Sequence, residues 1–160
     1  MTSAPEVRGL DDLLCFDLYA ATRAVTAYYR PLLEELGLTY PQYLVLVSLR
    51  PGRPVTVKQV AADLALDHGT LTPLLRRMEA AGLLTRERNA ADKRQVVVTL
   101  TDAGERLRLR FDDVQCAVSE AIGLAPAEFL QLQESLARLT GAVREATAAR
   151  GRQQADVSDR

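Results

Sequence analysis

The spacing of apolar residues along the chain predicts that it is built mostly of helices. Between Gly9 and Tyr29 apolar side chains recur every three or four positions, which is the period of one helix face. They are Leu10, Leu14, Leu18, Ala21 and Val25. We expect Pro31 to break or kink this helix. A second, nearly all-apolar helix is predicted from Tyr40 to about Leu49. Near the other end, a final helix starting at Pro126 carries the stripe Leu130, Leu132, Leu136, Leu139 and Val143.

The middle of the chain predicts two short helices followed by a β-hairpin. Thr56 and Gln59 form a capping-box pattern that starts a helix over 57–65. Asp67 or Gly69 starts the next helix, which ends at the C-terminal glycine Gly82. Strands are predicted over 83–88 and 95–100, joined by residues 89–94. A long helix follows from residue 101 to about residue 122, and the polar tail 150–160 is predicted to be disordered.

This order of helix, turn, helix and hairpin is the pattern of a winged helix-turn-helix. We therefore predict a mainly α fold with a small β-wing, in which residues 51–100 form the DNA-binding region. Residues 9–50 and 101–149 would form a helical dimerisation region of the same continuous domain. The hydrophobic core of one small domain is too small to bury the apolar stripes of both its first and its last helix. A homodimer would bury these stripes and present two recognition helices to a pseudo-palindromic site.

Composition and charge narrow the class of protein. The 160 residues, 48% of them hydrophobic, suffice for one domain, and no apolar run has the length of a membrane span. The N-terminal segment lacks the apolar stretch of a signal peptide, so a cytoplasmic protein with no membrane partner is expected. A net charge of −1 alone argues against a nucleic-acid partner. Between Arg50 and Arg94, however, nine Lys/Arg outnumber five Asp/Glu, which gives a local charge of +4 where phosphates would be neutralised.

The second helix of the predicted pair would enter the major groove of DNA with its first residues. These candidate base readers are His68, Thr70, Thr72 and Pro73. Further along, Arg76 and Arg77 would reach phosphates or guanine, and Lys93 and Arg94 at the hairpin tip would contact the minor groove or the backbone. The alternative is that these residues form a solvated helix face and a simple hairpin turn.

Cys15 and Cys116 are too few for a disulfide scaffold and lack the spacing of metal ligands, so we expect no metal and no cofactor. Cys15 lies one helical turn before Tyr19, and all five tyrosines fall within the first 43 residues. Tyrosine hydroxyls can donate hydrogen bonds to a thiolate, which is the form that reacts quickly with peroxides. The alternatives are a buried, inert cysteine and tyrosines that pack at a subunit interface.

Two segments, residues 13–46 and 64–101, resemble the MarR-type regulators of the organic-hydroperoxide-sensing OhrR group, and the resemblance extends over roughly residues 9–145. Leu14-Cys15-Phe16 together with residues 38–43 is its more specific part. The resemblance implies a homodimer whose reduced form represses a gene by binding a palindromic operator of double-stranded DNA. It implies that an organic hydroperoxide oxidises Cys15. Tyr29 and Tyr40 of the second subunit, with Tyr19 of the same subunit, would hydrogen-bond this sulfur.

The same resemblance implies roles in the wing and for the second cysteine. Asp92 would structure the wing by pairing with Arg94, the minor-groove residue, whereas His68 replaces the small residue expected at its position. Cys116 lies where two-cysteine members carry the cysteine that forms an intersubunit disulfide; the alternative is a buried structural thiol.

Two other classes of function remain open. A MarR-type repressor could be released by a small ligand, with Cys15 inert. An enzyme such as a thiol peroxidase is disfavoured because the only histidine, His68, lies in the predicted DNA reader and no nucleophile–base pair is apparent.

Overall fold

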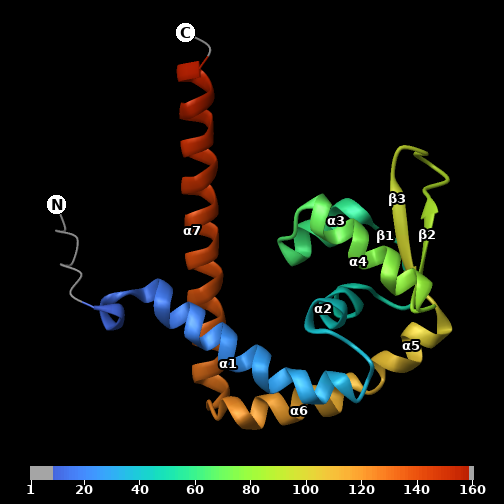
Figure 1. The fold of residues 1–160 in the computed structure, drawn as a ribbon, viewed down its shortest axis with the longest axis horizontal. Coiled ribbons are helices and arrows are strands. Elements are labelled where there is room, and N and C mark those ends of the chain that lie inside the picture. Colours follow the sequence, from blue (N-terminus) through green and yellow to red (C-terminus); the bar gives the residue numbers. More distant parts are fainter. Residues whose placement is uncertain (1–8, 159–160) are drawn as a thin grey trace. The chain divides into compact units, whose positions relative to one another are not determined.

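The computed structural model describes residues 9–158, which form a mainly helical chain with one small antiparallel sheet (Figure 1). The predicted fold class is confirmed. The chain divides between Val118 and Ser119 into two compact units, each of which is described by itself. The elements of the first unit are a 3-10 turn η1 (Leu10–Asp12), α1 (Leu14–Glu34), α2 (Tyr40–Ser48), β1 (Val55–Thr56), α3 (Val57–Leu64), α4 (His68–Ala80), β2 (Leu84–Arg88), β3 (Val96–Leu100), α5 (Asp102–Arg108) and most of α6 (Phe111–Ile122). The second unit holds the end of α6 and the long helix α7 (Pro126–Ser158).

The sheet has the strand order β1-β3-β2, and both pairings are antiparallel. Leu84 pairs with Leu100 and Arg88 with Val96, so β2 and β3 form the predicted hairpin. The two-residue strand β1 adds Val55 opposite Val98 and was not predicted. Through β1, the start of α3 is attached to the hairpin (Figure 1).

The hydrophobic core of the first unit lies behind α4 and the sheet. Its fully buried side chains come from α1 to α4 and from both hairpin strands, and they include Leu33, Tyr43, Leu46, Val60, Leu71, Leu75, Met78, Leu84 and Val98. Helix α6 adds Phe111, Val114 and Val118. Helix α4 is therefore held on its inner side by core packing, and its other side is exposed.

Three predicted boundaries were wrong. Helix α1 begins at Leu14 and continues through Pro31 to Glu34, because a proline in the last turn removes a single backbone donor and leaves the rest of the helix intact. The helix expected over 101–122 is two helices, since α5 ends at Arg108 and α6 begins at Phe111.

The third wrong boundary is the tail expected to be disordered, which is helical in α7 as far as Ser158. Its Ala, Arg and Gln residues are good helix formers. Residues 159 and 160 lie outside the described residues. None of the helices in the described part of the chain has the length and hydropathy needed to cross a membrane.

Candidate nucleic-acid interface and cysteine sites

The recognition helix α4 begins at a side-chain cap made by Asp67. Its Oδ1 accepts a hydrogen bond from the backbone N–H of Thr70 at 2.8 Å, and its Oδ2 accepts one from the Thr70 hydroxyl at 2.8 Å. These two bonds, with the hydroxyl as the larger cause, lower the pKa of Asp67. Because the Thr70 hydroxyl gives its proton to Asp67, only its oxygen lone pairs remain for another partner. Thr70 is thus part of the helix cap.

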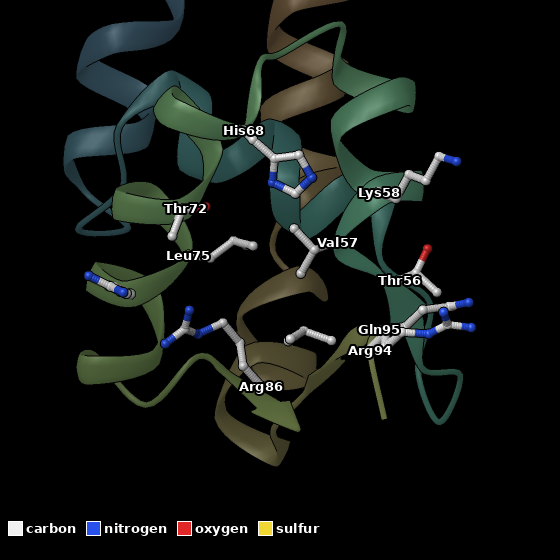
Figure 2. Close-up of a pocket in the computed structure, with 11 residues that line it drawn as sticks. Thr56, Val57, Lys58, His68, Thr72, Leu75, Arg86, Arg94 and Gln95 are labelled. Carbon is white, nitrogen blue, oxygen red and sulfur yellow. The ribbon is translucent and has the colours of Figure 1, made fainter. Parts of the chain in front are cut away.

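A groove of about 630 Å³ lies between α3, α4 and the wing (Figure 2). The side chains of Thr72 and Leu75 line one side, Thr56, Arg94 and Gln95 line the other, and His68 points between them (Figure 2). Of the predicted DNA-binding residues, the structure brings four together in this groove: His68, Thr72, Arg76 and Arg94. The groove lining does not include Thr70, Pro73, Arg77 or Lys93.

Sequence reasoning missed further lining residues, chiefly Lys58 and Gln95. Lys58 lies in the first turn of α3, two residues after the cap Thr56, whose hydroxyl accepts from the Gln59 backbone N–H at 3.1 Å. The Gln59 side chain donates to Asp63 at 2.6 Å, so one bond of the predicted capping box is seen. None of the eleven lining residues in Figure 2 is acidic, so the groove is an electropositive surface.

Arg86 also lines the groove, but its charge is paired with Glu79. Its Nε and Nη2 donate to Glu79 Oε2 at 2.9 and 2.7 Å, and its backbone N–H donates to Oε1 at 3.0 Å. The guanidinium hydrogen bond is the main cause of the lowered pKa of Glu79. Because Glu79 lies on α4 and Arg86 on β2, this pair braces the recognition helix against the wing.

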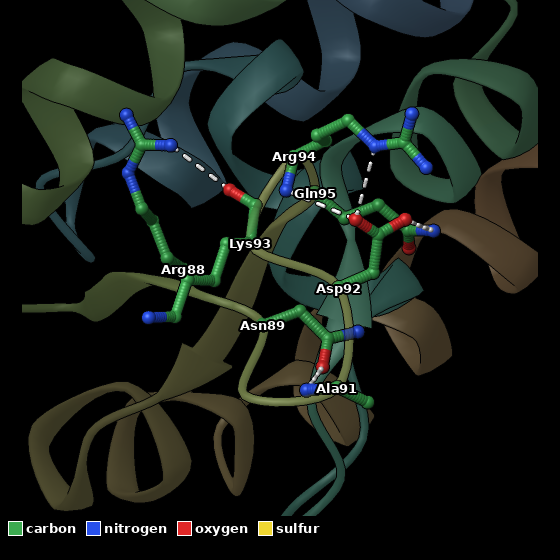
Figure 3. Close-up of polar contacts among 7 residues, drawn as sticks. All are labelled: Arg88, Asn89, Ala91, Asp92, Lys93, Arg94 and Gln95. Atoms are coloured by element: carbon green, nitrogen blue, oxygen red, sulfur yellow. Dashed lines mark hydrogen bonds and ion pairs between the residues drawn. The ribbon is translucent and has the colours of Figure 1, made fainter.

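The wing tip is organised by side chains that hydrogen-bond the backbone of their own turn (Figure 3). Asp92 Oδ1 accepts from the backbone N–H of Arg94 at 3.0 Å and from its Nε at 3.4 Å, and Oδ2 accepts from Gln95 Nε2 at 3.1 Å. The backbone bond from Arg94 is the largest cause of the lowered pKa of Asp92. Asn89 accepts from the Ala91 N–H at 2.9 Å. The Arg94 side chain is 94% exposed, so it is oriented by Asp92 and open to solvent.

A buried aromatic cluster lies where α1, α2 and α6 meet. The ring of Tyr29 is 4.9 Å from that of Tyr40 and 5.6 Å from that of Tyr43, and Tyr43 meets Phe111 edge-on at 4.7 Å. Gln115 Nε2 on α6 donates to the hydroxyls of both Tyr29, at 3.2 Å, and Tyr43. Burial raises the pKa of Tyr40 and of Tyr43. Tyr43 was not among the predicted site residues, although it lies one helical turn after Tyr40.

Both cysteines are exposed in the single chain. Cys15 lies in the first turn of α1, and Cys116 lies on α6 directly after Gln115. Tyr19 is 57% exposed, and its hydroxyl accepts from Arg23 Nη1 at 3.3 Å. The hydroxyls of Tyr19 and Tyr29 accept hydrogen bonds from Arg23 and Gln115, and their contact with a sulfur stays a prediction.

A capped recognition helix, an electropositive groove and an ordered wing define a winged-helix DNA-binding protein. Residues 27–109 match the model of the family described as transcriptional regulator SarA/Rot. An organic hydroperoxide resistance transcriptional regulator of Bacillus subtilis is 42% identical over 127 residues, which cover 79% of this chain and 86% of that protein.

Solved structures of AbfR, a protein of Staphylococcus epidermidis, are similar as well. Overoxidised AbfR bound to DNA is 36% identical, with a TM-score of 0.67 over 84% of this chain and 94% of that one. Disulfide-formed AbfR is 38% identical, with a TM-score of 0.58 over 81% and 91%. The chain thus belongs to the MarR-type transcriptional regulators, in the organic-hydroperoxide-resistance group, and its relatives are DNA-binding regulators rather than enzymes.

Proposed function

We propose that this protein is a homodimeric repressor that binds a palindromic operator while reduced and leaves it when an organic hydroperoxide oxidises Cys15. The observation that carries the proposal is the exposed Cys15 in the first turn of α1, in a chain 42% identical to a hydroperoxide-resistance regulator. An exposed thiol suits a sensor because oxidation requires access, and the proposed tyrosine hydrogen bonds would stabilise the reactive thiolate.

The dimer is supported by apolar side chains that a single chain leaves exposed. They lie on η1 and α1 and along α7, and the larger ones are Leu10, Leu14, Leu130, Leu132, Leu136 and Val143. A dimer that buries these residues would carry two electropositive grooves, one for each half of the operator. The geometry favours His68, Thr72 and Arg76 as the major-groove residues and Arg94 as the minor-groove residue. Pro73, Arg77 and Lys93, which the groove does not include, would contact the flanking backbone.

The sensing step is a two-electron oxidation of Cys15. In each subunit, the thiolate is stabilised by Tyr19 of the same chain and by Tyr29 and Tyr40 of the second copy. It attacks the terminal oxygen of the hydroperoxide, so an S–O bond forms as the O–O bond breaks, and the alkoxide leaves and is protonated to an alcohol. The product is a sulfenic acid on Cys15.

Cys116 completes the switch in the proposed two-cysteine mechanism. Its thiolate attacks the Cys15 sulfenic sulfur of the other subunit, the S–S bond forms, and hydroxide leaves as water with one proton. The exposure of Cys116 on α6 supports this role, because a resolving thiol must be reachable. A covalent link between the two subunits would then shift the recognition helices out of register with the operator.

One observation favours a second candidate, a repressor controlled by a small ligand. A pocket of about 300 Å³ lies between α1 and the start of α2, and its lining includes Arg30, Thr39 and Tyr40. Glu34 also lines this pocket, but Arg30 with the hydroxyl groups of Thr39 and Tyr40 can bind an organic anion, whose binding would change the position of α2 without cysteine chemistry.

The two candidates are separated by DNA binding with an operator selected by the reduced protein from random-sequence duplexes. We expect cumene hydroperoxide to release the wild-type protein, Cys15→Ser to stay bound, and a disulfide-linked dimer to appear on non-reducing gels unless Cys116 is replaced by Ser. Release of Cys15→Ser by the hydroperoxide, or no release of the wild type, overturns the redox proposal. Release by aromatic carboxylates in both proteins would support the ligand-controlled repressor.

A further inference from the structure

Gln115 joins two buried tyrosines beside the position of the second cysteine. Its Nε2 lies 3.2 Å from the hydroxyl oxygen of Tyr29 and also donates to the hydroxyl of Tyr43. Tyr29 and Tyr43 are 7% and 2% exposed, and Phe111 from α6 packs against the Tyr43 ring. A side chain that contacts both α1 and α2 from α6 is therefore held in one arrangement by its surroundings.

The direction of these hydrogen bonds determines to which partners the Tyr29 hydroxyl can still donate a hydrogen bond. An amide nitrogen has two hydrogens and no acceptor, so Gln115 gives one hydrogen to each phenol oxygen. The phenol oxygens of Tyr29 and Tyr43 are therefore both acceptors toward Gln115. Because the Tyr29 oxygen accepts from Gln115, its own O–H cannot donate to that nitrogen. The Tyr29 O–H is thus available to another acceptor.

We propose that Gln115 is a positioning residue for the sensing cysteine: by donating to Tyr29 and Tyr43 it orients the Tyr29 O–H toward the Cys15 thiolate of a second copy. This inference rests on the proposed contact between Tyr29 and Cys15. A phenol whose oxygen already accepts hydrogen bonds is also a stronger donor, because hydrogen bonds in a chain polarise one another. Gln115 thereby stabilises the thiolate without touching the sulfur.

The test uses two substitutions that differ in hydrogen-bond direction. In Gln115→Glu the carboxylate can only accept, so it takes the protons of both phenols and withdraws the Tyr29 donor from Cys15. In Gln115→Leu the amide is simply lost. Both are made in the Cys116→Ser full-length dimer, where Cys15 is the remaining thiol. Gln153→Glu, at an exposed position of α7, adds the same charge as a matched control.

The measurement is the rate of Cys15 alkylation by iodoacetamide between pH 5 and 9, since the thiolate is the reacting form. At pH 7 we expect Gln115→Glu to react roughly tenfold more slowly, which corresponds to about 1.4 kcal/mol, and Gln115→Leu to be slowed severalfold. In both variants the curve of alkylation rate against pH should shift to higher pH and reach the same maximum rate as the wild type. Altered packing or access to Cys15 would instead change the maximum rate. Gln153→Glu should match the parent protein.

Tyr29→Phe separates this inference from the proposed function. If Tyr29→Phe slows alkylation at pH 7 and the two Gln115 substitutions leave the profile unchanged, the tyrosine contact stands and the role of Gln115 is overturned. If Tyr29→Phe also has no effect, both are overturned. Circular dichroism and sedimentation show whether each variant is a folded dimer, and a changed maximum rate in Gln115→Leu without a pH shift likewise contradicts the inference.

Discussion

Gly104 in α5 lies against the backbone where α4 passes into β2, and the structure leaves no room there for a side chain. A Cβ atom at this position would overlap the carbonyl oxygen of Leu83, far inside the 3.0 Å limit for real contacts, and would lie 3.2 Å from Leu100 Cδ2. The Leu83 carbonyl is fixed, because it accepts from the Thr101 N–H at 3.2 Å. The Thr101 hydroxyl donates to the neighbouring Gly82 carbonyl at 2.6 Å. We therefore predict that Gly104→Ala forces α5 away from the start of β2.

The size of this effect follows from three contributions. Inserting a methyl group into a closed contact costs about 1–3 kcal/mol. If the displacement breaks the two Thr101 hydrogen bonds, each adds about 1 kcal/mol. Alanine in a helix interior is favoured over glycine by about 1 kcal/mol, which offsets part of this loss. The expected net change is a loss of about 2–4 kcal/mol in the free energy of unfolding.

Urea unfolding followed by far-UV circular dichroism, at one fixed chain concentration, measures this change. Gly141→Ala is the matched control, because a Cβ at Gly141 in α7 meets no atom within 4 Å. It should gain up to about 1 kcal/mol from helix propensity alone. If Gly104→Ala is as stable as the wild type, the close approach of α5 to Leu83 is refuted.

Three further predictions concern the groove, the wing and the link between α2 and α5. Arg76→Ala should weaken operator binding about tenfold and reduce the slope of log affinity against log salt by about one, while Arg77→Ala, outside the groove lining, has a smaller effect; fluorescence anisotropy at several salt concentrations measures both. The pKa of Asp92 is lowered by folding, so the order that Asp92 gives the wing is fully present above its unfolded value of 3.8 and is lost as the pH falls further, through the lower pKa of the folded state. The Arg94 amide resonance should follow this loss in an NMR titration, and Asp92→Asn should abolish the pH dependence. Arg108→Met removes the donor that bonds the carbonyls of Leu46, Val47 and Leu49 and should lower unfolding stability by about 2 kcal/mol; an unchanged urea midpoint would contradict this.

Local signals made much of the DNA-binding region predictable from the sequence. Asp67 as an N-cap and Gly82 as a C-terminal glycine mark both ends of the recognition helix, and α4 ends at Ala80, two residues before that glycine. The β-branched strand and the polar turn likewise mark the hairpin, which the structure places at 84–88 and 96–100. These features depend on neighbouring residues, so a single sequence suffices to find them.

Other features depend on contacts between distant residues, and the sequence pattern does not record them. The break between α5 and α6 is one example: the inward-facing positions Gly104, Leu107, Phe111, Val114 and Val118 keep a continuous helical spacing across it. The set of residues that line the groove is a second example. Thr70 and Thr72 are equivalent in the sequence, but Thr70 is bonded to Asp67 and Thr72 faces the groove. The Arg86–Glu79 pair also could not be inferred, because it joins two separate elements.

A continuous set of contacts connects the tyrosine cluster with the DNA-binding groove. Gln115 and Phe111 of α6 contact Tyr43 of α2, and the C-terminal carbonyls of α2 bind Arg108 of α5. At its other end α5 is bonded through Thr101 to the start of β2, and β2 is braced to α4. Helix α5 is thus fixed to the winged region, while α6 is fixed to the tyrosines.

Residues 109–110 separate these two sets of contacts, and Leu109 is 79% exposed. A displacement of α6, which the proposed disulfide at Cys116 would require, would therefore act through two connections: the contact of α6 with Tyr43 of α2, and the short bend into α5. Both connections meet at Arg108, because this residue ends α5 and holds the end of α2. A coupling of this kind requires two discrete arrangements of these contacts, and the bend at 109–110 is where the backbone can change without breaking a helix.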